Sequence, residues 1–196
     1  MESYGERRTV NDKLRTFTSR DLALVAGLTG LYLVYGYASG VTFGHTILEL
    51  DLFFLISAFF TIVVSMTGKR WSATLLGTVN GLILLGEPNA PVAITLALIP
   101  NGIIFDLALY TRDHTIDRLS RKRFVIAGAL GNLAMAISGL IILQAIGFFQ
   151  GQGLEFILVT SIIALVTNPL VGAIGAFFGT VVVERVGERV RSPLIR

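Results

Sequence analysis

Charged residues in this chain are gathered at short intervals, and six long stretches between them contain no Asp, Glu, Lys or Arg. These charge-free stretches are 22–48, 52–68, 71–86, 88–105, 124–154 and 156–183. A helix of about 20 residues, within a range of about 17–25, crosses a bilayer core about 30 Å thick. Uniformly apolar stretches favour helices over barrel strands, in which apolar and polar residues alternate. The sequence therefore predicts an all-α integral membrane protein, a bundle of about six transmembrane helices.

Three of these stretches carry an irregular feature. Residues 124–154 end in the Gly- and Gln-rich sequence 147–153, which predicts a turn and a helix end near Phe148. Asn168-Pro169 lies in the middle of the last stretch. Because proline removes a helix hydrogen bond, we expect a kink or a break there. The stretch 71–86 is barely long enough to cross a bilayer.

The basic residues fix an orientation for this bundle. Six helices place all 16 lysines and arginines on one side, and the other side holds Glu49, Asp51, Glu87 and Glu155. An odd number of crossings would destroy this separation. Since basic loops stay in the cytoplasm, we expect a multi-pass protein of the cell membrane with both termini cytoplasmic. Its parts would be a tail over 1–20, a transmembrane domain over 21–185 and a tail over 186–196.

Few residues in the sequence are suited to catalysis or to metal binding. There is no cysteine, and the two histidines, His45 and His114, fall on opposite sides of the membrane. No zinc-protease, nucleophile-elbow or phosphate-loop motif is present. We therefore expect no enzyme, no cofactor and no metal. The net charge of +3 is explained by basic residues that flank helices, so no nucleic acid partner is expected either.

Asp106 is the one acidic residue inside a predicted helix, and it allows two interpretations. It lies about one turn before Tyr110 and Arg112, near the expected cytoplasmic headgroups. The favoured interpretation is an interfacial carboxylate paired with a cytoplasmic arginine. The other is a role in proton transfer or coupling, because ionisable groups in membrane helices are often functional.

Small residues recur four apart in three of the predicted helices. Such spacing lets helix backbones approach closely. For Gly77/Gly81 and Gly175/Gly179 we favour packing inside the bundle. In the first helix a face that docks a partner helix is about as plausible as internal packing, and that face consists of Ala23, Ala26, Gly27 and Gly30.

Uncharged polar residues inside the helices indicate a partly polar interior, since they face lipid only at a cost. They are Asn80, Asn101, Asn132, Gln144 and Asn168, and for each one an interhelical hydrogen bond is the simplest role. Around the acidic side lie aromatic, acidic and amide residues without any basic residue. This set would suit a small planar or cationic ligand through stacking and cation–π contacts. Its members are Tyr32, Tyr35, Tyr37, His45, Glu49, Glu87, Asn89, Gln150, Gln152 and Glu155.

The layout resembles the substrate-binding S components of energy-coupling factor vitamin transporters, in the branch linked to thiamine and hydroxymethylpyrimidine. At the level of amino-acid sequence, the resemblance is confined to two short segments. They are Phe17-Thr-Ser-Arg-Asp-Leu-Ala-Leu and Gly68-Lys-Arg-Trp-Ser-Ala-Thr-Leu-Leu-Gly-Thr-Val-Asn-Gly81, which leads into Gly86-Glu-Pro-Asn-Ala-Pro91. Over the rest of 17–185 the likeness is one of helix layout.

The resemblance implies a subunit that captures a vitamin or its precursor from outside. It would then dock on a transmembrane coupling protein and two cytoplasmic ATPases, which are separate chains. The docking face of the family uses small residues of the first helix, which here correspond to Ala23, Ala26, Gly27 and Gly30. Its ligand site lies in the outer half, which on this chain corresponds to Tyr35, Tyr37, His45, Glu49, Asn80, Glu87, Asn89, Gln144 and Glu155.

Two other functional classes stay open at the level of sequence. A non-catalytic assembly subunit of a membrane complex would use the same small-residue faces but would lack an outer pocket. A self-sufficient channel or carrier, or a membrane enzyme without a known motif, is the third class. Carriers often contain interrupted helices at corresponding positions of two halves, whereas Pro100 and Pro169 do not correspond in this way.

Overall fold

The computed structural model describes residues 16–43, 49–86, 90–109 and 120–191, and all regular structure in these ranges is helical. This confirms the all-α fold. The helices are α2 (Ser19–Phe43), α3 (Leu50–Thr67), α4 (Ser72–Leu84), α5 (Val92–Leu109), α6 (Arg121–Ala145) and α7 (Leu154–Arg191).

Five of these helices are long and apolar enough to cross a membrane, as expected for a multi-pass membrane protein. The exception is α4, which has 13 residues and is therefore about 20 Å long. It corresponds to the stretch that the sequence marks as barely sufficient. Its length is limited by Trp71, which has a φ of 71° immediately before the helix, and by the turn at Leu85 and Gly86.

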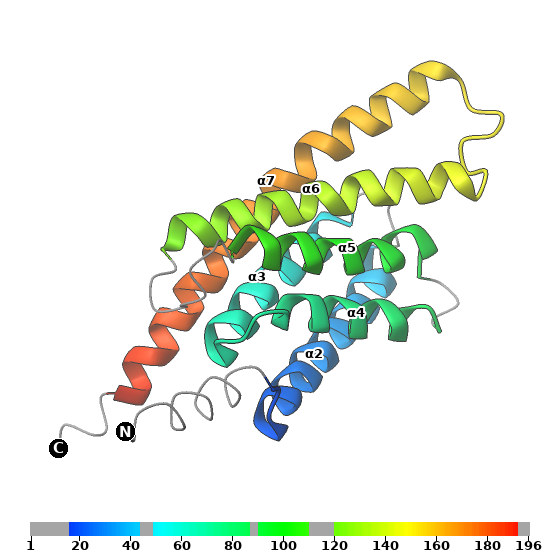
Figure 1. Ribbon diagram of the computed structural model, residues 1–196. Helices are drawn as coiled ribbons and strands as arrows, with labels where there is room; N and C mark the ends of the chain where they lie inside the picture. Colours follow the sequence, from blue (N-terminus) through cyan, green and yellow to red (C-terminus); the bar gives the residue numbers. More distant parts are fainter. Residues whose placement is uncertain (1–15, 44–48, 87–89, 110–119, 192–196) are drawn as a thin grey trace, which may run out of the picture.

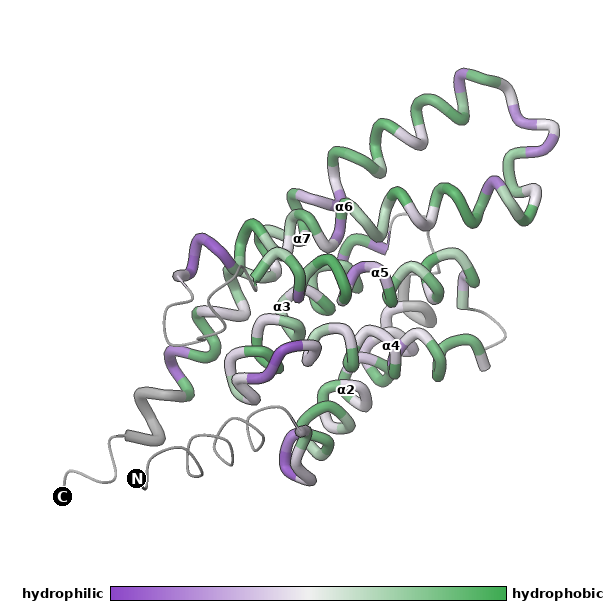
Figure 2. The backbone as a smooth tube through the Cα atoms, in the orientation of Figure 1, coloured by the Kyte–Doolittle hydropathy of each residue, from purple (hydrophilic) through white to green (hydrophobic). Residues whose placement is uncertain are grey.

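The helices run alternately in opposite directions, so the bundle has two distinct ends (Figure 1). We call the end where α2, α4 and α6 begin the basic end, because the described lysines and arginines lie there. The opposite end, with Glu49, Asp51 and Glu155, is the acidic end. Figure 2 shows the most hydrophilic segments at the start of α2, the α3–α4 junction and the start of α6. The side of the membrane that each end faces stays a prediction.

Close approach of helix backbones occurs where glycines face a neighbouring carbonyl group. A β-carbon at Gly77 would lie 2.5 Å from the Leu98 carbonyl oxygen, and one at Gly179 would lie 2.7 Å from that of Ala58. Gly128 and Gly172 face each other between α6 and α7 in the same way. The expected internal packing of Gly77/Gly81 and Gly175/Gly179 is therefore confirmed.

A hydrogen-bonded asparagine joins four helices at the centre of the bundle. Asn132 Oδ1 accepts hydrogen bonds from Ser57 Oγ and Asn101 Nδ2, each at 3.0 Å. Its Nδ2 donates to the backbone carbonyls of Phe53 and Asn168, at 3.3 and 3.2 Å. The amide thereby uses both of its donors and both acceptor positions. The interhelical role expected for the amides of Asn101 and Asn132 is confirmed. The Asn168 side chain instead donates within α7, to the Ala164 carbonyl at 2.9 Å, and only its backbone carbonyl meets Asn132.

The last helix continues through Pro169 without interruption. Figure 1 shows α7 changing direction between its orange and red parts, so a kink rather than a break accommodates the proline. Beyond this bend the acidic-end parts of α6 and α7 extend away from the other helices (Figure 1). In this arm, residues 141–163, Phe149 is the only buried side chain.

Polar contacts hold α2 at the basic end. Thr18 and Asp21 form a reciprocal cap, in which the Thr18 backbone N–H donates to Asp21 Oδ2 at 2.7 Å and the Asp21 N–H donates to Thr18 Oγ1 at 3.3 Å. The Lys69 ammonium pairs with the Asp21 carboxylate and donates to the Thr16 carbonyl. The two sequence pieces that carry the family resemblance therefore meet at this ion pair.

Asp106 is fully buried in α5, where its carboxylate faces the start of α4. Its Oδ2 accepts hydrogen bonds from the backbone N–H and the hydroxyl of Thr74, both at 2.7 Å. A carboxylate is favoured there by the positive end of the helix dipole. Among the described residues no ion pair joins Asp106 to an arginine. The carboxylate thus caps a neighbouring helix, a role that the expected arginine pairing did not include.

Candidate functional site

A cavity of about 520 Å³ lies at the acidic end between α2, the start of α3, the end of α4 and the start of α5. This volume falls within the range of about 300–1,000 Å³ that is typical of small-molecule sites. Its lining residues are Tyr32, Leu33, Val34, Gly36, Tyr37, Glu49, Leu52, Ile83, Leu84, Gly86, Ala90, Pro91, Ile94 and Thr95.

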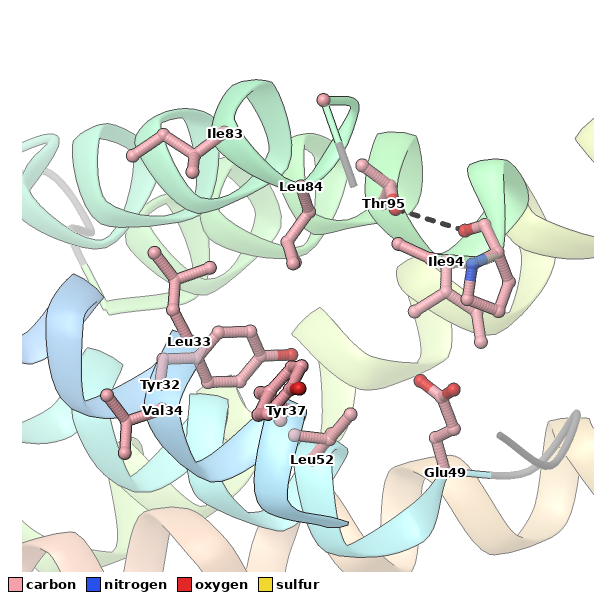
Figure 3. A pocket seen from close by; sticks show the side chains of 14 residues that line it. Tyr32, Leu33, Val34, Tyr37, Glu49, Leu52, Ile83, Leu84, Ile94 and Thr95 are labelled. Carbon is pink, nitrogen blue, oxygen red and sulfur yellow. Dashed lines mark hydrogen bonds between the residues drawn. The ribbon is translucent and has the colours of Figure 1, made fainter. Parts of the chain in front are cut away.

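The polar chemistry of the cavity comes from two phenols and one carboxylate. Figure 3 shows the ring of Tyr32 and the carboxylate of Glu49 directed into the space between α2 and α5, with Tyr37 beside them. Tyr32 is buried, whereas Tyr37 is 72% exposed and lies at the mouth. Aliphatic side chains form most of the remaining wall, and no Lys, Arg or His belongs to the described lining.

Glu49 is held at the cavity by an unusual backbone conformation. It immediately precedes α3 and has a φ of 26°, which is uncommon for a residue other than glycine. Its carbonyl oxygen accepts the first-turn hydrogen bond from the Phe53 N–H at 3.1 Å. The side chain is buried, although glutamate is rarely buried in proteins. Strained backbone and a buried carboxylate together are typical of functional positions.

The start of α5 forms another part of the cavity wall, with Pro91, Ile94 and Thr95. There the Thr95 hydroxyl donates to the Pro91 carbonyl oxygen at 3.0 Å, as the dashed line in Figure 3 marks. Pro91 and Ile94 also line a second, apolar cavity of about 320 Å³ between α5 and the base of the arm. One turn of helix therefore separates the two cavities.

Two of the site residues expected from the sequence, Tyr37 and Glu49, line the larger cavity. Tyr35 is exposed and instead faces Asp51, whose carboxylate also accepts a hydrogen bond from Ser39. Asn80 is fully buried in α4. Gln144 and Glu155 are exposed on the arm, away from the cavity. His45, Glu87 and Asn89 lie outside the described residues.

Sequence reasoning placed Tyr32 among the outer aromatic residues without including it in the site, and it did not single out the aliphatic wall. The signal for Tyr32 was available, because it lies one helical turn before Gly36, where a β-carbon would be 3.5 Å from Leu52. Small and aromatic residues one turn apart share a helix face. The aliphatic residues carry no comparable signal, since every helix of the bundle is rich in them.

The arrangement is suited to binding a ligand. It presents phenol rings for stacking, a carboxylate for a cation or a donor group, and an apolar wall. The described residues contain no group of three or more His, Asp or Glu side chains that could hold a metal ion. Comparisons of the chain with protein-family models, with curated proteins and with solved structures found no match in any of the three.

Proposed function

We propose that this chain is the substrate-binding membrane subunit of an uptake transporter for a vitamin or vitamin precursor of the thiamine or hydroxymethylpyrimidine type. ATPases on separate chains would energise transport. The observation that carries the proposal is the ligand-sized cavity at the acidic end, with Tyr32, Tyr37 and the buried Glu49 in its wall.

The cavity chemistry favours a planar ligand with a positive charge or donor groups. A carboxylate in an apolar surrounding attracts a cation more strongly than it would in water, because the local dielectric constant is low. Aromatic faces add cation–π attraction. With no basic residue in the described lining, an anionic ligand would meet only repulsion from Glu49.

A capture subunit also needs a surface for its membrane partner, and the small-residue face of α2 is available for this. Ala23, Ala26, Gly27 and Gly30 are all exposed. A β-carbon at Gly27 or Gly30 would meet no atom within 4 Å. A transmembrane coupling protein could pack its own helix closely against this face.

The same exposed face favours a second candidate, a non-catalytic assembly subunit of a membrane complex. That subunit would need the α2 face but no ligand cavity. The two candidates differ in whether the purified chain binds a small molecule.

The proposal is tested by a ligand screen on the purified full chain in detergent, read out by thermal midpoint and by calorimetric titration. Tryptophan emission is a poor reporter, because Trp71 lies at the basic end, away from the cavity. A ligand at 100 times its dissociation constant should stabilise the fold by about 2.7 kcal/mol. Absence of any hit, together with a stoichiometric membrane partner, would instead favour the assembly subunit.

Glu49→Gln sharpens the screen. We expect its affinity for thiamine, which is cationic, to fall about 10- to 100-fold, since a hydrogen bond to a charged group contributes about 1.5–3 kcal/mol. A neutral pyrimidine precursor should lose less. The matched control is Glu155→Gln, which removes the same charge from an exposed position at the same end. Equal losses from both variants would show that only the overall charge of this end matters.

A further inference from the structure

Asn80 is a fully buried amide that has no hydrogen-bond partner among the described residues. It lies in α4, and neither its Nδ2 nor its Oδ1 forms a hydrogen bond within the part of the chain that the structure describes. The Oγ1 of Thr29, buried in α2, is also unpaired there. Buried polar groups are nearly always paired, so each unpaired group calls for a physical explanation.

Asn132 shows how differently the same side chain behaves elsewhere in the bundle. Its amide makes four hydrogen bonds to residues of α3, α5 and α7. Both amides are completely buried, yet only Asn132 contributes to holding helices together. A structural role therefore explains Asn132 and leaves Asn80 unexplained.

The position of Asn80 relates it to the cavity. Asn80 precedes Ile83 and Leu84 by three and four residues, and both of these line the cavity. Residues three and four apart lie on one helix face, about one turn of 5.4 Å from each other. Thr29 precedes the cavity residue Tyr32 by three residues in α2, which packs against α4. Two unpaired polar groups thus lie one turn below the cavity on neighbouring helices.

We propose that the Asn80 carboxamide is a specificity-determining group of this cavity, which selects ligands that present a hydrogen-bond donor beside an acceptor. A carboxamide offers one donor and one acceptor side by side and pairs with such an edge through two hydrogen bonds, as asparagine does with adenine in DNA. Amides, lactams and amino-substituted nitrogen heterocycles carry this edge. The inference rests on the proposed function and adds which chemical group of the ligand the protein recognises, namely a hydrogen-bond donor beside an acceptor.

The ligand edge reaches Asn80 by rotation of the side chains one turn above it, those of Leu84 and Tyr32. Glu49 then faces the more exposed part of the ligand, toward the mouth at Tyr37. Thr29 supplies a further hydroxyl next to the bound edge. Without ligand the amide is desolvated and unpaired, which destabilises the empty protein, and a matching ligand removes this penalty.

The test compares the purified wild-type chain in detergent with Asn80→Leu and with Asn132→Leu as the matched control. The probes are thiamine and 4-amino-5-hydroxymethyl-2-methylpyrimidine. We expect Asn80→Leu to keep or raise the ligand-free thermal midpoint and to lower the affinity for both probes at least tenfold. Asn132→Leu should lower the ligand-free midpoint, because it removes four hydrogen bonds.

Two results would overturn the role of Asn80 alone. One is wild-type binding that Asn80→Leu leaves unchanged, and the other is a ligand-free midpoint that falls as far as in Asn132→Leu. A wild type that binds neither probe nor any other member of the vitamin panel overturns the proposed function and this inference together. Asn80→Ala provides the same affinity comparison where the leucine variant does not fold.

Discussion

Helices α2 and α7 both carry small residues at four-residue spacing, but these residues are packed against other helices in α7 and exposed in α2. In α7, Gly172, Gly175 and Gly179 lie against the backbones of α6 and α3, where a β-carbon would collide with a carbonyl group. In α2, Gly27 and Gly30 face open space. Instead, α2 is attached through Val25, Leu28 and Tyr32 on its other face and through the Asp21–Lys69 ion pair at its start.

The difference teaches that a pattern of small residues shows how closely another helix can approach. It does not show whether that helix belongs to the same chain or to a partner protein. In α7 the approaching surface is another helix of the same chain. In α2 the surface is left exposed, which is the arrangement that a partner protein needs. The following variants test whether the two helices are held by these different means.

Lys69→Met should have the largest effect on stability. It leaves the buried carboxylate of Asp21 without its cation, and breaking a buried pair in this way costs about 3–5 kcal/mol. The measurement is the free energy of unfolding in detergent. The double variant Lys69→Met/Asp21→Asn should regain most of the loss. A loss below about 1 kcal/mol in the single variant would mean that the apolar face of α2 alone holds this helix.

Gly172→Leu should rank next. Gly128 and Gly172 are in mutual contact, so a larger side chain has to push α6 and α7 apart. Overpacking of this kind costs about 1–3 kcal/mol, occasionally more. The thermal midpoint of the purified variant should fall accordingly. An unchanged midpoint would contradict the close approach of the two helices.

Gly27→Leu should have the smallest effect on the isolated chain. No atom lies within 4 Å of the added β-carbon, and substitutions at such surface positions change stability by about 0.5 kcal/mol or less. Under the proposed function, the same variant should also fail to co-purify from cells with the proposed coupling protein, since leucine destroys the flat face. If Gly27→Leu unfolded as readily as Gly172→Leu, the glycine face of α2 would not be exposed in the isolated chain, and the difference between the two helices would be refuted.

The polar residues inside the helices show where sequence reasoning reached its limit. It expected Asn80, Asn101 and Asn132 to avoid lipid, and all three are buried. It could not separate the saturated amide of Asn132 from the unpaired amide of Asn80. The partners of the Asn132 amide lie 31 or more positions away in the sequence, as its contact with Asn101 illustrates.

The sequence by itself determined the helices, their approximate ends and the separation of basic from acidic ends. These properties follow from runs of apolar residues and from the charges between them, and bilayer thickness imposes a length on each run. Proline marked the bend in α7 for the same local reason, since it removes one hydrogen bond of its own helix.

Only the tertiary structure decided which face of each helix meets a neighbour. That choice grouped Tyr32, Tyr37 and Glu49 around one cavity, turned Asp106 toward the start of α4 and left the glycines of α2 exposed. The physical reason is that nearly every face of these helices is apolar. The position of each helix beside its neighbours is therefore fixed by the shape of the packed side chains and by a few polar contacts between distant segments. No local sequence pattern encodes these contacts.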